Sequence, residues 1–229
     1  MISKPPDGVP GSGASDASID APSTARLPAT VIRSGAMPAA CSSSAFAAST
    51  ARASGVPVSL DVDTVYPGFE SVLRNVDYLV AGSGWPAKWT GESDPFVALR
   101  LLHGEYGCRV SAMTLGDHGA LAYSQGVWTY SPAFEVSCAD TTGAGDVFHG
   151  AFCYAMLEQM PMQQALDFAN AAAAMNCMAI GARGQVPVRA EVDALLAAAA
   201  TGRTKRRCDP DIAERCSSEK VLYASPVNR

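Results

Sequence analysis

Two carboxylates frame a run of small residues at 140–146, which reads DTTGAGD and precedes a long apolar segment. Gly143, Ala144 and Gly145 carry almost no side chain, so an anion can approach their backbone N–H groups closely. The helix that we expect from Gly145 onward adds unpaired N–H donors and the positive end of its dipole. This run is therefore suited to holding a phosphate group.

Asp146 lies at the edge of this anion hole, where a carboxylate can accept the proton of a hydroxyl group that attacks phosphorus. Asp140 and Thr142 add hard oxygen atoms that suit a cation. A capped helix after a glycine turn would use the same residue types, with Thr142 or Asp146 as the N-cap. Agreement over seven positions favours the phosphate site. The run is neither a GxxxxGK[ST] loop nor a GxGxxG loop.

Strands and helices alternate on either side of this run, which predicts a parallel sheet covered on both faces. Asp94 followed by Pro95 is a typical helix start. The expected strands cover 56–63, 76–82, 109–116 and 133–137, with a hairpin within 119–132. The expected helices cover 45–55, 67–75, 94–106, 145–160, 162–180 and 188–200.

Composition limits the function classes. The net charge of -5 argues against a nucleic-acid-binding surface. Seven cysteines without a CxxC pair favour a reducing, cytoplasmic compartment, and no apolar run reaches the roughly 20 residues that span a membrane.

The ends of the chain differ from the middle. Residues 1–44 are rich in Ala, Ser and Pro, and we expect them to lie outside the fold as a disordered or non-native segment. The ordered nucleotide-binding and catalytic portion is expected at 45–200, and 201–229 as a flexible polar tail. Its basic cluster, Arg203, Lys205, Arg206 and Arg207, is interpreted as solvated.

The stretch DTTGAGDVF at 140–148 resembles the C-terminal signature of the PfkB/ribokinase-like carbohydrate kinase family. TLGDHGA at 114–120 resembles the nucleotide-site segment of that family, and VPVSLDVD at 56–63 resembles its mid-domain strand. ANAAAAMNCMAIGA at 169–182 resembles the helix beside the adenine. The resemblance covers roughly the C-terminal half of a typical member. It implies a ribokinase-like three-layer α/β/α sandwich with a mainly parallel central sheet, truncated at the N-terminal side.

The resemblance also implies an activity, the transfer of the γ-phosphoryl group of ATP to a sugar hydroxyl, with Mg²⁺ and K⁺ as cofactors. Asp146 would be the catalytic base, and the anion hole would be Gly143, Ala144 and Gly145. The nucleotide site would include Thr114, Gly116, Gly119 and Asn170. The K⁺ site would use Asp140 and Thr142 with backbone carbonyls near Asn176, Ala179 and Gly181.

The sequence departs from the family in two places. Family members usually carry an N-x-x-E segment that organises magnesium, whereas AGSGWPAKWTG at 81–91 has no carboxylate and Glu92 has the wrong spacing. The N-terminal half that grips the sugar is not recognisable, so an open sheet edge would attract a second copy or a protein partner. Besides a sugar kinase, two alternatives stay open: a nucleotide-binding remnant that acts through a partner, and a nucleoside kinase of the same superfamily.

Other polar and aromatic residues have weaker patterns. His149 is more consistent with a packed or hydrogen-bonded side chain than with a phosphate ligand. Asp61 and Asp63 could face the substrate or cap the turn that follows their strand. We expect packing roles for Cys138, Cys153, Trp85, Trp89 and Trp128.

Overall fold

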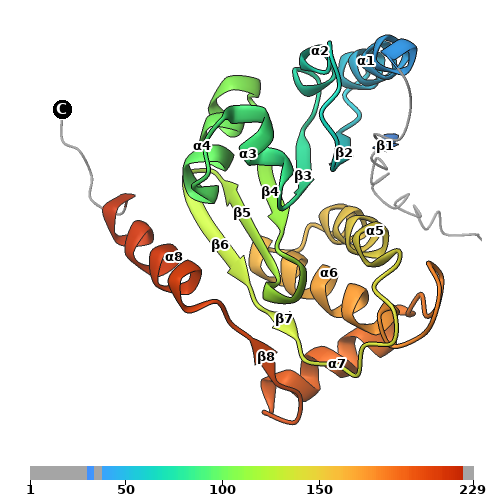
Figure 1. The fold of residues 1–229 in the computed structure, drawn as a ribbon, viewed down its shortest axis with the longest axis vertical. Coiled ribbons are helices and arrows are strands. Elements are labelled where there is room, and N and C mark those ends of the chain that lie inside the picture. The colour runs from blue at the N-terminus through green and yellow to red at the C-terminus, as the bar shows by residue number, and fades with distance from the viewer. Residues whose placement is uncertain (1–29, 34–37, 224–229) are drawn as a thin grey trace, which may run out of the picture.

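The computed structural model describes residues 30–33 and 38–223 (Figure 1). Six strands form the main sheet in the order β1-β2-β3-β4-β5-β6. The first four run parallel, and β5 and β6 are antiparallel to their neighbours. The strands are β1 (Thr30–Arg33), β2 (Val58–Val62), β3 (Tyr78–Gly82), β4 (Val110–Thr114), β5 (Ala120–Ser124) and β6 (Val127–Ser131).

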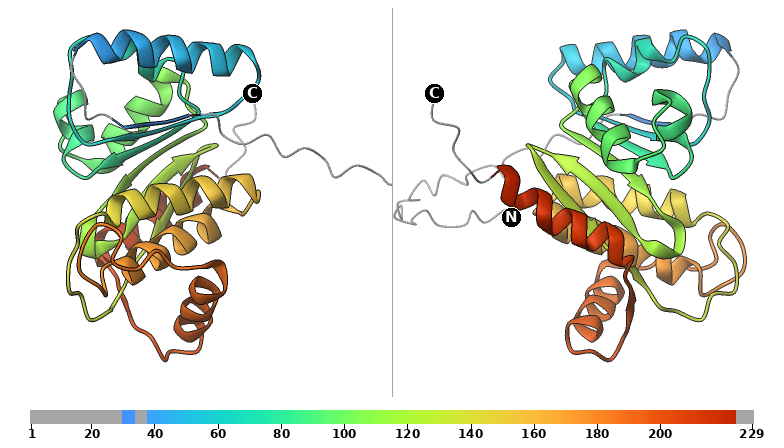
Figure 2. Two further views of the ribbon diagram at one scale, coloured as in Figure 1. Left: turned by 90° about the vertical axis from the view of Figure 1, so that its right-hand side faces the viewer. Right: turned by 60° about the vertical axis from the view of Figure 1, so that its left-hand side comes forward.

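Helices cover both faces of this sheet (Figure 2), each over its own apolar core. One face carries α1 (Pro38–Ala53), α2 (Glu70–Leu73), α3 (Trp85–Thr90), α4 (Pro95–Tyr106) and α8 (Pro210–Tyr223). The other carries α5 (Ala144–Leu157), α6 (Met162–Asn176) and α7 (Arg189–Ala200). The three-layer α/β/α prediction with a mainly parallel sheet is therefore confirmed.

The side chains of β2 show how one strand serves both layers. Val58, Leu60 and Val62 belong to the core under α1 and α2. Ser59 points to the opposite face, where its hydroxyl lies 3.1 Å from the Nε2 atom of His149 on α5. Successive side chains of a strand alternate between faces, so both sides of this buried strand need side chains that fit a protein interior.

The ordered portion begins earlier in the chain than the predicted residue 45. The prediction that residues 1–44 lie outside the fold is wrong for Thr30–Arg33, which pairs in parallel with β2, and for α1, which begins at Pro38. The physical reasons are the strong helix preference of alanine and the backbone pairing offered by a distant strand. The rest of the predicted segment, 1–29 and 34–37, lies outside the described residues.

The ordered portion also extends farther along the chain than the predicted end at residue 200. Residues 201–223 are no loose tail: β8 (Arg206–Arg207) pairs with β7 (Ala133–Phe134) in a second small sheet, and α8 follows. The strand expected at 133–137 is shorter than predicted and lies outside the main sheet. Figure 1 shows α8 lying along β6. Residues 224–229 of the predicted tail are not among the described ones.

Several local predictions are confirmed in detail. The Asp94 carboxylate accepts hydrogen bonds from the N–H groups of Phe96, at 2.9 Å, and Val97, at 3.4 Å, and so caps α4. The hairpin turns at Gln125 and Gly126, both with positive φ. Helix α3 was not predicted. None of the described helices is both long and apolar enough to cross a membrane.

Candidate active site

The 140–146 run forms the loop before α5 and the first residues of that helix. Asp140 organises it: its Oδ1 atom accepts hydrogen bonds from the N–H of Thr142, at 2.9 Å, and from the hydroxyl of Thr142, at 2.7 Å. Its Oδ2 atom accepts one from the N–H of Gly181 at 2.8 Å. These bonds, that from the backbone of Thr142 above all, hold the pKa of Asp140 below its usual value. The carboxylate therefore joins two segments that are far apart in sequence.

The end of α6 supports the same loop from the other side. The carbonyl oxygen of Cys177 accepts hydrogen bonds from the N–H groups of Ala139, at 2.7 Å, and Asp140, at 3.2 Å. The side-chain amide of Asn176 donates to the carbonyl oxygen of Thr142 at 3.1 Å. The Oδ1 atom of Asn176 is buried and has no hydrogen-bond donor among the described residues. This acceptor, beside Asp140 and Thr142, fits a cation.

Gly143 is the N-cap of α5 and has a φ of 80°. A Cβ atom there would lie 2.4 Å from the carbonyl oxygen of Ala182, so the backbones approach too closely for any side chain. A Cβ atom at Gly145 would meet nothing within 4 Å. The start of α5 therefore has one glycine packed against Ala182 and a second glycine, Gly145, that faces open space.

Asp146 lies in the first turn of α5 and is exposed. It borders a groove of about 720 Å³ that runs over α5, α6 and α7. Val147, Gly150 and Arg183 border the same groove. A carboxylate here is accessible to a small substrate, on a different side of the helix from Ala144.

Ala144 and Thr141 border a separate cleft of about 610 Å³. Gly116 lies on the wall of this cleft, and so does Asn170 on α6. The structure thus brings together three of the predicted elements: the start of α5, the 116–119 turn and the helix beside the predicted adenine position. The remaining lining residues are Asp117, Ala133, Phe134, Glu135, Val136, Cys138, Ala173, Ala174, Cys177 and Arg207.

The other two predicted nucleotide-site residues stand behind this wall. Thr114 ends β4 and pairs with Ala120. Gly119 is buried with a φ of 99°, and a Cβ atom there would overlap the carbonyl oxygen of Ser131 at 2.0 Å. Its carbonyl oxygen accepts a hydrogen bond from the N–H of Leu115 at 2.7 Å. Gly119 therefore shapes the turn that carries Gly116 instead of lining the cleft itself.

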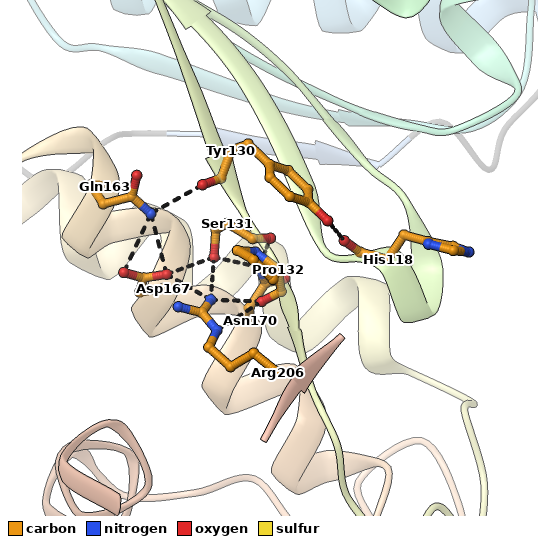
Figure 3. Close-up of polar contacts among 8 residues, drawn as sticks. All are labelled: His118, Tyr130, Ser131, Pro132, Gln163, Asp167, Asn170 and Arg206. Atoms are coloured by element: carbon orange, nitrogen blue, oxygen red, sulfur yellow. Dashed lines mark hydrogen bonds and ion pairs between the residues drawn. The ribbon is translucent and has the colours of Figure 1, made fainter. Parts of the chain in front are cut away.

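Asn170 is buried and anchored to the sheet. Its amide nitrogen donates to the carbonyl oxygen of Ser131, at 2.8 Å, and to the Ser131 hydroxyl, at 2.7 Å (Figure 3). Around Ser131 these bonds join a cluster that includes Asp167 and Arg206. The position of Asn170 on the cleft wall is thus fixed by contacts with β6.

Among the weaker candidates, His149 is hydrogen-bonded and buried, as predicted. Asp63 accepts a hydrogen bond from the hydroxyl of Thr64 at 3.0 Å, which is a turn contact. Trp85 and Trp128 are core residues, and Trp89 stacks on Trp85.

The two cysteines that flank the loop differ. Cys153 is buried and its pKa is raised by that burial. The packing role predicted for Cys138 is wrong, because this residue is exposed on the wall of the cleft.

Two cleft residues, Asp117 and Arg207, were missed. The basic cluster was interpreted as solvated, which is wrong for Arg206: its guanidinium pairs with Asp167 at 2.7 Å. The missed signal was Asp209-Pro210, the same pair of residue types that marks the start of α4. Asp209 caps α8 by accepting from the N–H groups of Asp211 and Ile212.

The fold and the loop define a class of protein: an α/β protein in which a glycine-containing helix start borders a cleft of about 610 Å³. The pfkB family carbohydrate kinase model matches residues 28–189, and the chain belongs to this family.

The ribokinase of Haemophilus influenzae is 30% identical over 150 residues, which cover 63% of this chain and 49% of that protein. The ribokinase of Bacillus subtilis is 48% identical over 65 residues, 28% of this chain and 22% of that protein. The chain therefore spans about half, or less, of the length of these curated relatives.

Solved structures show the same similarity. Arabidopsis thaliana ribokinase complexed with ribose and ATP is 30% identical, with a TM-score of 0.60, over 68% of this chain and 52% of that chain. A putative ribokinase from Agrobacterium tumefaciens is 29% identical, with a TM-score of 0.62, over 69% of this chain and 53% of that one.

Proposed function

We propose that this chain carries the nucleotide-binding and catalytic part of an ATP-dependent carbohydrate kinase, with Asp146 as the general base. The observation that carries the proposal is the geometry of the 140–146 loop. Gly143 can only be glycine, the start of α5 is bare, and Asp146 stands exposed in the first turn of the helix. Its family membership and the ribose and ATP of the A. thaliana ribokinase complex support the same reaction class.

In this mechanism the cleft holds the nucleotide and the start of α5 faces its terminal phosphate. The N–H groups of Gly143 and Gly145 and the helix dipole stabilise the negative charge of the transferring phosphoryl group, whereas the N–H of Ala144 donates to the carbonyl oxygen of Thr141 at 3.1 Å. The sugar hydroxyl oxygen attacks the γ-phosphorus, its proton passes to the carboxylate of Asp146, and ADP leaves with the bridging oxygen. Asp146 can accept the proton because its carboxylate is exposed in the first turn of α5, on the groove next to the helix start.

The proposal involves two cations, a monovalent cation held by the loop and the Mg²⁺ of the nucleotide. For the monovalent cation, the fit is good: the ionised Asp140, Thr142 and the orphaned Oδ1 atom of Asn176 form one cluster. This ion would fix the loop and thereby the anion hole. For Mg²⁺, the described residues contain no group of three or more His, Cys, Asp or Glu side chains that could hold a metal. We therefore expect magnesium to arrive with the phosphates of the nucleotide, as part of the substrate.

The test is direct. The purified chain is incubated with MgATP, K⁺ and a panel of pentoses, hexoses and nucleosides, and sugar phosphate is detected by mass spectrometry. We expect one class of acceptor to gain a phosphoryl group at a rate above that of ATP hydrolysis. Phosphorylation of nucleosides alone would replace the sugar-kinase assignment with the nucleoside-kinase alternative.

A second candidate, a nucleotide-binding protein without transfer activity, rests on one observation. The segment at 81–91, where the family carries its magnesium-organising acid, forms α3 with Trp85 and Pro86 buried. Hydrogen exchange with and without MgATP distinguishes the outcomes: protection of 114–120 and 140–146 without product formation favours this candidate. Absence of protection in both segments would exclude both functions.

A further inference from the structure

The C-terminal arm, defined as β8 and α8, lies beyond the part of the chain that matches the family, since the match ends at 189. Arg207 of β8 lies on the wall of the cleft. Helix α8 then runs along β6 (Figure 1). The N–H of Glu135 donates to the carbonyl oxygen of Lys205 at 3.0 Å, so β8 is bonded to the strand that forms the cleft wall.

Arg206 anchors the arm beneath the cleft. Its Nη2 atom donates to the Ser131 hydroxyl at 2.8 Å and pairs with Asp167 at 2.7 Å (Figure 3). Its guanidinium carbon lies 4.5 Å from the centre of the Phe134 ring. Because Ser131 also binds Asn170, the arm and the predicted adenine wall share one network.

Further contacts fix the arm where β8 leads into α8. The N–H of Asp209 donates to the hydroxyl of Tyr130 at 2.8 Å, and that hydroxyl donates to the carbonyl oxygen of His118 at 2.7 Å. Farther along, Arg215 pairs with Asp94 at 2.9 Å. These bonds hold Arg207 in place before any ligand binds, which lowers the entropic cost of using it.

Arg207 follows Arg206 directly, so its side chain leaves the strand on the opposite side. It lines the cleft and forms an ion pair with Asp117, which lies in the turn next to Gly116. Both side chains are largely exposed, at 54% and 68%, and an ion pair exposed in this way contributes little stability. The guanidinium can therefore exchange Asp117 for another anion at small cost.

The charges of the residues that line the cleft indicate which anion would replace Asp117 beside Arg207. Among the described residues that line it, Arg207 is the single cation, whereas Asp117 and Glu135 are acids. Without Arg207, the charged side chains that line the cleft would all be negative and would repel the phosphate groups of a nucleotide. The start of α5 would then be the remaining group that attracts them. A guanidinium is also suited to phosphate, because its planar fork can donate two parallel hydrogen bonds.

We infer that Arg207 is a nucleotide-binding residue that the C-terminal arm adds to the cleft, and that it contacts a phosphate group of the bound nucleotide in exchange for Asp117. The inference rests on the proposed function of the cleft. It assigns a binding role to a segment outside the family match and distinguishes phosphate contact from mere support of the cleft wall.

The experiment compares nucleotides with the nucleoside. Binding of MgADP, MgATP and adenosine to the full chain is measured by calorimetry for the wild type, Arg207→Ala, Arg207→Lys and the control Arg203→Ala. The control removes the same charge four residues earlier in the chain, just before the arm, at a position outside the cleft lining. Thermal unfolding of each variant is recorded in parallel to confirm that the exposed substitutions leave the fold intact.

We expect Arg207→Ala to weaken MgADP and MgATP about tenfold, as for loss of a charged hydrogen bond in a half-exposed position. Adenosine binding should stay unchanged, Arg207→Lys should be intermediate, and Arg203→Ala should match the wild type. Unchanged MgADP affinity of Arg207→Ala, or an equal loss for adenosine, would overturn the inference and leave the proposed function standing. A wild-type chain that binds neither nucleotide nor nucleoside would overturn both.

Discussion

Replacement of Gly143 by alanine tests whether the start of α5 is built as described. The substitution adds one methyl group at a residue with φ of 80°, where the new Cβ atom would lie 2.4 Å from the Ala182 carbonyl oxygen and 2.8 Å from the Ala182 Cα atom. Either the loop shifts away from the 181–184 turn or the helix start unwinds. In both cases the anion hole is displaced.

Two contributions set the loss in the free energy of unfolding that we expect for Gly143→Ala. The left-handed conformation costs a residue with a Cβ atom roughly 1–2 kcal/mol, and forcing a methyl group into a closed contact costs roughly 1–3 kcal/mol more. Gly143→Ala should therefore lower the free energy of unfolding by about 2–5 kcal/mol. The matched control is Gly150→Ala, in the middle of the same helix, where a Cβ atom would meet nothing within 4 Å. It should stabilise the protein by about 0.5–1 kcal/mol.

The assay is urea unfolding followed by circular dichroism, with MgADP affinity measured on the same samples. We expect opposite shifts of the midpoint for the two variants and loss of MgADP binding only for Gly143→Ala. If Gly143→Ala unfolded at the wild-type midpoint and bound MgADP normally, the close contact with Ala182 and its role in the anion hole would both be refuted.

Three further predictions concern the cap of α4, the loop acid and the thiols. Asp94→Ala should lower the free energy of unfolding in urea by about 1–2 kcal/mol, because it removes the N-cap bonds as well as the ion pair with Arg215. Asp94→Asn loses the ion pair but keeps an oxygen for the cap, so its loss should be smaller; equal losses would contradict the cap. The pKa of Asp140 is lowered by its bonds to the loop, so its contribution is fully present above the unfolded value near ~3.9 and is lost as the pH falls through the folded pKa. Asp140→Asn should flatten the acid limb of the urea midpoint against pH, and an unchanged limb would argue against these bonds. Burial raises the pKa of Cys108 to about 11, so iodoacetamide at pH 8 should label the exposed Cys138 and Cys208 before Cys108, as read by mass spectrometry; equal rates for Cys108 would contradict that burial.

Much of the fold was accessible from local patterns. The alternation of apolar strands and amphipathic helices gave the layers, and Asp94-Pro95 gave the start of α4. The same signal at Asp209-Pro210 was overlooked because the surrounding polar residues hide the apolar side of α8, where Cys216 enters the core. Strand β1 was missed because its four residues acquire meaning only by pairing with β2.

The site was accessible only in part, because its geometry depends on distant contacts. The DTTGAGD run predicts an anion hole, which stays a prediction; the structure shows that Gly143 must be glycine because its backbone lies against that of Ala182. The bonds from Asn170 to Ser131 and from Arg206 to Asp167 join residues tens of positions apart, and no local pattern encodes them. Gly119 lies behind the cleft wall because its backbone packs against the carbonyl oxygen of Ser131. This contact exists only in the folded protein and has no local pattern in the sequence.

The role of Asp146 is the central claim, and Asp146→Asn tests it most directly. ADP release and MgATP affinity are measured for this variant and the wild type, with the best acceptor from the panel. We predict that the substitution lowers turnover by at least roughly 100-fold while MgATP affinity stays the same, since general-base catalysis typically contributes a factor of that size or larger. Full turnover of Asp146→Asn would contradict the account.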